Sequence, residues 1–243
     1  MNERLKEIVD NFDRMKIGLD DTFKFHCTMC GKCCINRDDI LLNPKDLFNI
    51  SKELGLKPIE TINQYCDTYI GSDSRFPIVR LQPKGSIQRC PLLKDRKCSV
   101  HKVKPTVCAM FPIGRVLSFD PKKKSAVDVT PGEVSYIFVN PGCGDVAETH
   151  TVREWLSDFD IPSEDAYFVK WQSHLTDLSR FLIWVEKKSN PKDNFIETIW
   201  NVIFTVAYCN YDTAKEFTPQ FDTNMEALKS ILEPFGFQRR QTK

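Results

Sequence analysis

Four cysteines lie within eight consecutive positions near the start of the chain, in the stretch HCTMCGKCCIN: Cys27, Cys30, Cys33 and Cys34. The first three have the spacing Cys-x2-Cys-x2-Cys, by which a short loop can bring three thiolates to one metal centre. Bacterial-type ferredoxins hold an iron–sulfur cube with this spacing and use a distant Cys-Pro pair as well. Cys90-Pro91 is such a pair. Because zinc sites also use Cys-x2-Cys, the run indicates a metal without separating zinc from iron.

Further cysteines follow in a second block, and one lies between two glycines in NPGCGD, on a predicted turn. With the first run they make eight candidate metal ligands: Cys27, Cys30, Cys33, Cys34, Cys90, Cys98, Cys108 and Cys143. Eight thiolates could hold two four-ligand centres, or one cluster with the remainder structural or reactive. Cys34 is either a ligand of a second centre or a free thiol, because the side chains of adjacent residues diverge.

Two other cysteines and one histidine are expected to stay outside the metal site. Cys66, in TINQYCDTYI, and Cys209, in VAYCNYD, are predicted to be buried small hydrophobes. His101 could join Cys98 and Cys108 in a zinc site. A helix-surface histidine is the favoured interpretation, because a metal-bound histidine needs a further positioned hydrogen-bond partner.

Cations next to the candidate ligands would offset the negative charge of several thiolates on one metal. Lys32, Arg89 and Lys97 are adjacent to candidate ligands in the sequence and are predicted to serve in this way. A dithiol oxidoreductase using Cys27 and Cys30 is an alternative, because Cys-x2-Cys lowers thiol pKa values. It ranks last, since such an enzyme needs two cysteines rather than eight.

The composition is that of a globular protein with an ordinary core. The chain has 243 residues, 41% of them apolar, so folding does not depend on disulfides. Its net charge of +1 gives no indication of a nucleic-acid partner. The N-terminal stretch has no signal-peptide pattern, and the longest apolar runs are too short for a bilayer. We expect a cytoplasmic location without membrane contact, where dense cysteines favour metal or catalytic roles over structural disulfides.

Short strands and helices are predicted to position these thiols. The alternating stretch TFKFHC leads into the first run as a strand, and FPIVRLQ and VSYIFVN are also predicted strands. Helices are predicted over residues 3–16, from Pro44 to about Leu54, from Pro58 to about Tyr69, and briefly after Pro105. The C-terminal part is predicted to be helical over 151–159, 163–187, 192–208 and 221–233, with all four Trp residues in a bundle core.

The expected fold class is α+β, mainly helical. A metal-organised, cysteine-rich domain with short strands is predicted over residues 1–148, and a helical C-terminal segment packed on it over 149–243. The boundary is placed in NPGCGDVAETHTV, because every cysteine except Cys209 precedes it and glycine and proline also concentrate there.

The blocks CTMCGKCC, CPLLKDRKCSVHKVKPTVCAMFPIG and NPGCGD resemble the YkgJ-type cysteine-cluster family, described as a zinc- or iron-chelating domain with a Cys-x2-Cys-x2-Cys-Cys start. The resemblance covers residues 25–145. The chain keeps the family pattern at Cys90, Leu93, Cys98, Pro105, Cys108, Phe111 and Pro112. It departs at His101, where Tyr is common, and at Lys104 and Ala109, where the family has Arg. The family thus manages without a histidine at position 101, and its basic residue next to Cys108 is missing here.

Three functions follow from the residues and the resemblance. The favoured prediction is an iron–sulfur protein with a [4Fe–4S]-type centre for redox or enzymatic work, acting with an unknown protein or redox partner. The alternative is a zinc-stabilised module whose helical half binds a partner. A related cysteine cluster in flagellin lysine N-methylase implies a protein-lysine N-methylase-like enzyme as a third hypothesis. The sequence has no Gly-rich nucleotide loop after a strand, so a standard dinucleotide-type methyl-donor site is not visible. Catalytic residues stay unassigned.

Overall fold

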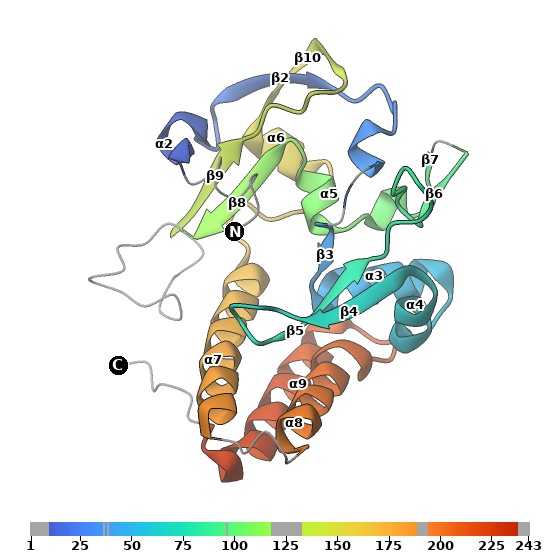
Figure 1. The fold of residues 1–243 in the computed structure, drawn as a ribbon. Helices are drawn as coiled ribbons and strands as arrows, with labels where there is room; N and C mark the ends of the chain where they lie inside the picture. The colour runs from blue at the N-terminus through green and yellow to red at the C-terminus, as the bar shows by residue number, and fades with distance from the viewer. Residues whose placement is uncertain are drawn as a thin grey trace.

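A computed structural model describes the chain over residues 10–35, 37, 39–95, 97–117, 133–188 and 194–237. These residues form an α+β fold in which helices combine with short antiparallel strands (Figure 1). The fold class expected from the sequence is confirmed at this level. None of the helices in the described ranges has both the length and the apolar character needed to cross a bilayer.

Two antiparallel strand arrangements form the part of the fold that contains β2, the strand before the cysteine run. One sheet has the order β1-β9-β8, with β1 at Lys16–Ile17, β8 at Ile113–Leu117 and β9 at Val134–Phe138. A separate pair joins β2 (Thr22–His26) to β10 (Asp145–Thr151). β1 is followed along the chain by β2, and β9 by β10, so the two consecutive strands on each side pair antiparallel with the two on the other. The loop that carries Cys143 lies at this transition.

The alternating side chains of β2 hold the strand in place. Phe23 and Phe25 point inward and are buried, whereas Lys24 is exposed. Both rings pack edge-on against Trp155 of α6 (Val152–Ser157), at centroid distances of 5.8 and 5.7 Å. Since the cysteine run begins directly after β2, this packing positions its first residue.

A second sheet has the order β3-β5-β4, with β3 at Leu41–Leu42, β4 at Cys66–Ile70 and β5 at Pro77–Leu81. Beside it lie α3 (Pro44–Leu54) and α4 (Pro58–Tyr65). The start of α3 is set by Asn43, whose side-chain oxygen accepts from the Asp46 backbone N–H at 2.9 Å. The helix ends at Gly55, which has a left-handed φ of 66°.

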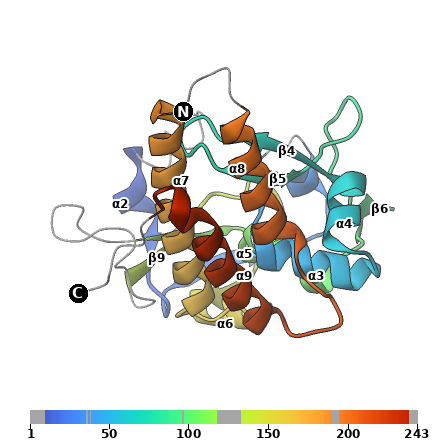
Figure 2. The ribbon, with the colours of Figure 1, turned by 90° about the horizontal axis from the view of Figure 1, so that it is seen from below.

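The C-terminal helices lie against the second sheet and α3, away from the β2–β10 pair (Figures 1 and 2). They are α7 (Ala166–Lys188), α8 (Phe195–Phe204), which continues into a π-helix at Thr205–Cys209, and α9 (Phe217–Leu232). The remaining short elements are α2 (Phe12–Met15), 3-10 helices at Lys32–Cys34, His101–Val103 and Glu233–Phe235, β6 (Leu93–Lys94), β7 (Lys97–Cys98) and α5 (Thr106–Met110).

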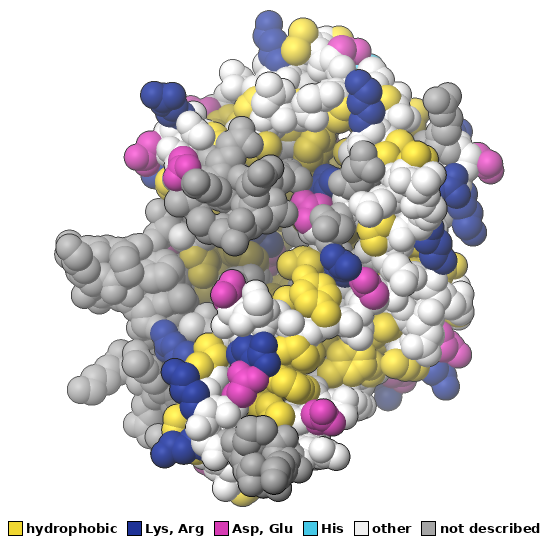
Figure 3. Space-filling model, viewed as in Figure 1, with side chains coloured by type: hydrophobic (Ala, Val, Ile, Leu, Met, Phe, Trp, Pro, Cys, Tyr) yellow, Lys and Arg dark blue, Asp and Glu magenta, His cyan; other side chains and the backbone are white. Residues whose placement is uncertain are grey.

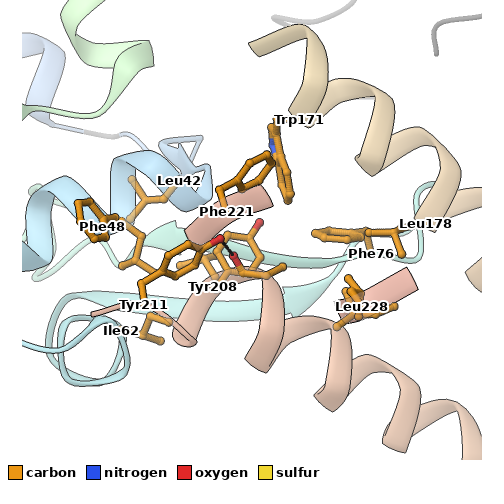
Figure 4. Packing of buried hydrophobic residues seen from close by; sticks show 14 of the residues in the cluster. Leu42, Phe48, Ile62, Phe76, Trp171, Leu178, Tyr208, Tyr211, Phe221 and Leu228 are labelled. Carbon is orange, nitrogen blue, oxygen red and sulfur yellow. Dashed lines mark hydrogen bonds between the residues drawn. The ribbon is translucent and has the colours of Figure 1, made fainter. Parts of the chain in front are cut away.

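Two clusters of buried apolar residues stabilise the fold. In the larger one Phe76, Trp171 and Tyr208 meet with ring centroids 5.8 to 6.3 Å apart (Figure 4). The smaller one is centred on Phe23, Phe25 and Trp155. Each cluster contains residues from both sides of position 148. The N-terminal and C-terminal parts of the chain therefore share both cores.

Several predicted elements are confirmed where local signals are strong. The strands at TFKFHC, FPIVRLQ and VSYIFVN are β2, β5 and β9, and the helix from Pro44 to Leu54 is α3. The turn of helix after Pro105 is α5, and the helix over 151–159 is α6.

Other predicted boundaries are wrong. The helix from Pro58 ends at Tyr65, because residues 66–70 pair with β5 as strand β4. The helix expected from 163 begins at Ala166, after the Asp165 carboxylate that accepts from the Phe168 backbone N–H at 3.0 Å. The last helix begins at Phe217 rather than 221.

Part of the predicted N-terminal helix lies outside the described residues. These are residues 3–9, and the described remainder of 3–16 contains only α2 followed by β1. Residues 192 and 193, at the start of the helix predicted over 192–208, also lie outside them.

The four Trp residues do not share one bundle core. Trp155 belongs to the smaller cluster and Trp171 to the larger one, and Trp200 packs against the larger cluster. Trp184 is 47% exposed and stacks on Phe181. The prediction that all four lie in a helical bundle core is therefore wrong for Trp155 and Trp184.

Candidate metal centre

The cysteine run is a tight loop between β2 and β3. It needs left-handed backbone at Met29, with φ 51°, and at Gly31, with φ 74°. Gly31 then opens the 3-10 helix Lys32–Cys34. His26, just before the run, is held by the Asp145 carboxylate at 3.1 Å from its Nδ1. The beginning of the loop is thus hydrogen-bonded to β10 through His26, and its end forms a single 3-10 turn.

Cys33 and Cys34 are the centre of the thiol arrangement. Their sulfurs are 3.9 Å apart, close enough for the Cys34 thiol to donate to the Cys33 thiolate. This contact lowers the pKa of Cys33 and raises that of Cys34. The sequence argument that adjacent cysteines diverge therefore does not describe the thiols here, because the 3-10 turn brings their sulfurs together.

The second cysteine block is joined to the run through the main chain. The Cys90 backbone N–H donates to the carbonyl oxygen of Cys34 at 2.8 Å. Cys98 follows on the hairpin β6–β7, where it pairs with Leu93. Cys108 lies on α5, and its backbone N–H donates to the Pro105 carbonyl oxygen at 2.8 Å.

Burial distinguishes the inner thiols of the site from its outer ones. Desolvation raises the pKa of the Cys90 thiol and of the Cys108 thiol, and repulsion from Cys33 adds to both shifts. Cys27 and Cys30 are exposed. The pKa of Cys30 is lowered, chiefly by the backbone N–H of Lys32 and also by that of Gly144. In the absence of metal, the protonated form is favoured at Cys90 and Cys108, and the thiolate is favoured at Cys30.

Cys143, in the loop between β9 and β10, lies near the exposed thiols Cys27 and Cys30. Burial raises the pKa of Cys143 to about 11, with further contributions from the negative charges of Cys33, Cys30 and Cys27. The flanking Gly142 and Gly144 both have positive φ, 59° and 71°. A Cβ at Gly144 would clash with the His26 carbonyl oxygen and the Phe25 ring, so only glycine permits this close approach.

Two cations near the thiols differ from those expected. Arg37 reaches the Cys33 carbonyl oxygen with Nη1 at 3.5 Å and pairs with Asp39 through Nε. The charges of Arg37 and Lys104 both lower the pKa of Cys33. The charge of Arg37 also opposes the rise in the pKa of Cys108 that burial causes. Sequence adjacency could not identify Arg37, since it follows the run by several positions.

A buried carboxylate supports the helix that carries Cys108. Asp46 is 5% exposed and accepts from the Thr106 backbone N–H at 2.9 Å and from its hydroxyl at 2.6 Å. The other Asp46 oxygen accepts from the Asn43 side-chain amide at 2.7 Å. One carboxylate thus joins the N-termini of α3 and α5, and it fixes the direction in which Cys108 points.

The eight candidate ligands form a chain of neighbours rather than a closed site. Cys33 acts electrostatically on Cys30 and Cys143 on one side, and on Cys34, Cys90 and Cys108 on the other. Cys98 acts on Cys90 and Cys27 on Cys143. Within the described residues, no three His, Cys, Asp or Glu side chains are arranged around one ion position. The donor set itself, eight free thiols, suits zinc or iron–sulfur centres.

The two cysteines and the histidine that were not assigned to the site have the following surroundings. Cys66 is buried in the larger apolar cluster, and Cys209 packs against that cluster. His101 is exposed, and its ring lies 6.3 Å from that of Phe159. The prediction of a buried thiol is confirmed for Cys66, whereas Cys209 is only partly buried, and His101 is a surface histidine as expected.

The comparisons with known proteins agree with this thiol-rich arrangement. Residues 26–130 match the model of the CxxCxxCC family, whose description reads "Putative zinc- or iron-chelating domain". A relative named "Uncharacterized protein MJ0661", from Methanocaldococcus jannaschii, is 31% identical over 90 residues, which cover 36% of this chain and 44% of the relative. The chain thus spans less than half the length of this curated relative. No solved structure is significantly similar. The family that matches over residues 26–130 is thus the one that the cysteine spacing resembles, and the match covers less than half of the chain.

Proposed function

We propose that the cysteine-rich part of the chain is organised by an iron–sulfur centre of the [4Fe–4S] type, which serves redox or enzymatic work. The observation that carries this proposal is the hydrogen bond from the Cys90 backbone N–H to the Cys34 carbonyl oxygen, 2.8 Å long. It brings a Cys-x2-Cys-x2-Cys run next to a Cys-Pro pair, the combination that bacterial-type ferredoxins use. A bound cluster would supply one-electron chemistry.

The electrostatic contacts between the thiols support a division of the eight ligands into two groups. Cys27, Cys30 and Cys143 form an outer group, and Cys34, Cys90, Cys98 and Cys108 form an inner one, with Cys33 between them. The division is compatible with two four-ligand centres in which Cys33 completes the outer set. Cations at Arg37 and Lys104 would offset part of the thiolate charge.

Zinc is the second candidate, because the family description names zinc beside iron. A zinc ion bound by four thiolates would stabilise the same loops without redox chemistry. In this case the C-terminal helices would be the part that binds a partner protein.

The deciding experiment is metal and acid-labile sulfide analysis, with an absorption spectrum, on protein purified without air. About four iron and four sulfide per chain, with broad visible absorption, supports one [4Fe–4S] centre, and about eight of each supports two. Stoichiometric zinc without sulfide would replace the iron–sulfur proposal by the zinc one. Neither metal in protein that is folded by circular dichroism would contradict both.

A further inference from the structure

We infer that an open cavity beside the cysteine run binds an organic molecule carrying at least two negative charges. The cavity has a volume of about 1240 Å³ and is lined by residues of the β1-β9-β8 sheet and of the β2–β10 pair. Cys33 and Cys143 form part of its wall. An occupant would therefore lie against two candidate metal ligands, although anion binding itself requires neither thiol nor metal.

Basic side chains outnumber acidic ones in the lining of this cavity. Its cations are Arg14, Lys16, Lys24, Lys32 and Arg37. Its one carboxylate among the described lining residues is Asp145. That carboxylate already accepts from His26 Nδ1 at 3.1 Å and from the Ala147 backbone N–H at 3.0 Å. Among the Lys, Arg, Asp and Glu side chains that line the cavity in the described part of the chain, cations therefore outnumber carboxylates, and this favours an anion.

Most of these cations have no carboxylate partner of their own within the described ranges. Arg37 pairs with Asp39, whereas no described carboxylate pairs with Arg14, Lys16, Lys24 or Lys32. This excess of basic over acidic side chains is confined to the cavity, because the whole chain has a net charge of only +1. On the face shown in Figure 3, basic and acidic side chains are intermixed.

The strand register explains why cations from separate segments meet here. Lys16 pairs with Ile137 of β9, and Lys24 pairs with Thr149 of β10. Each strand arrangement thus contributes one lysine, and the cysteine run adds Lys32. Lys32 and Arg37 could serve the thiolates of the metal centre. The other three cations lie on α2, β1 and β2, outside the cysteine run, and are available to bind an anionic ligand: Arg14, Lys16 and Lys24.

The wall also contains an apolar part. Phe111 and Phe138, both only partly buried, line the same cavity as the cations. Concave sites with apolar and aromatic walls and a few charged groups are typical of small-molecule binding, whereas protein partners more often use flatter surfaces. Phosphate esters and dicarboxylates share the required chemistry, a compact dianion on an organic body.

The test is titration calorimetry of the full chain with phenyl phosphate, phthalate and uncharged benzyl alcohol, at about 0.15 M salt. We expect one or both anions to bind and benzyl alcohol not to. The variant Lys16→Gln/Lys24→Gln should weaken anion binding about tenfold or more, because it removes two charged donors. The matched control is Lys187→Gln/Lys188→Gln, two exposed lysines at the end of α7, which changes the net charge equally. It should bind as the wild type does.

Each outcome decides the inference. Preference for phenyl phosphate identifies a phosphate ester, and preference for phthalate a dicarboxylate. Failure of both anions to bind wild-type protein overturns the inference, as does an equal loss in the two double variants. Binding of polyglutamate without either small anion would overturn it in favour of an acidic protein partner. Metal content is measured on the same samples. If the protein contains no metal, the iron–sulfur proposal fails, but the measured affinity for the anions still tests the cavity.

Discussion

The Cys90 backbone N–H donates a hydrogen bond to the carbonyl oxygen of Cys34, at 2.8 Å, and joins two cysteine blocks that are far apart in the sequence. The bond uses main-chain atoms, so it does not depend on what the sulfurs bind. The ligand groups are therefore brought together by the fold as well as by a metal. Substitution of a single cysteine should accordingly remove the metal without removing the hydrogen bond between the backbone atoms of residues 90 and 34.

Replacing Cys30 or Cys33 by Ser should strip the metal and lower the thermal midpoint of unfolding, because metal binding contributes directly to the stability of such domains. Metal analysis and thermal unfolding followed by circular dichroism measure both effects. Cys209→Ser is the matched control, since burial alone raises the pKa of Cys209 and no candidate ligand contributes to that shift. Full metal content in either Cys30→Ser or Cys33→Ser would refute the ligand assignment.

Arg37→Gln should raise the pKa of Cys33 in metal-free protein. In the wild type this pKa is lowered to about 6, mainly by the Cys34 thiol and also by the charges of Arg37 and Lys104. The rate of Cys33 alkylation by iodoacetamide should therefore be near its maximum at neutral pH and fall as the pH drops through about 6. Peptide mass spectrometry should show this profile displaced to higher pH in Arg37→Gln.

Lys97→Gln is the control for Arg37→Gln, because Lys97 is adjacent to Cys98 in the sequence and is exposed. It should leave the Cys33 alkylation profile unchanged. An equal displacement in both variants would mean that overall charge, rather than the position of Arg37, sets the reactivity of Cys33.

Metal-free protein should lose stability in alkaline solution because of its buried thiols. Burial raises the pKa of Cys66 to about 12 from an ordinary 9.0. The folded state thus holds this proton more tightly than the unfolded state. Its contribution is fully present below about pH 9 and is lost as the pH rises toward the folded value, by about 1.4 kcal/mol per pH unit. Urea unfolding at about pH 8 and pH 10 measures the loss.

Cys66→Ala isolates this contribution from the titration of other groups. The variant is expected to be less stable than the wild type near neutral pH, but its stability should fall less steeply between the two pH values. A slope identical to that of the wild type would show that Cys66 does not contribute to the alkaline loss.

Asp46→Ala should destabilise the protein by about 3 kcal/mol, because it leaves buried donors at Asn43 and Thr106 without an acceptor. Since Thr106 begins the helix that carries Cys108, metal retention should fall as well. Asp20→Ala removes an exposed ion pair with Arg153 and should hardly change the thermal midpoint. Wild-type stability in Asp46→Ala would contradict the supporting role of the buried carboxylate.

The predictions from sequence succeeded where a signal is local. Asn43, Pro44 and Gly55 set both ends of α3, and the alternation of TFKFH set β2. The predictions were wrong where the secondary structure of a segment depends on pairing with a strand distant in the sequence. Residues 66–70 continue a helical apolar pattern, yet they form β4 because β5 offers backbone partners. β8 and β10 were missed for the same reason, since each exists only through its pairing with β9 or β2.

The sequence by itself determined which thiols are available and which family the domain resembles, because ligand type and short-range spacing are properties of the covalent chain. It could not determine which cations face those thiols. Arg37 and Lys104 act on Cys33, and Cys143 meets Cys30, because strand pairing and a buried carboxylate bring distant segments together. Only the tertiary structure decided that arrangement, since electrostatic interactions depend on distance in space and not on separation along the chain.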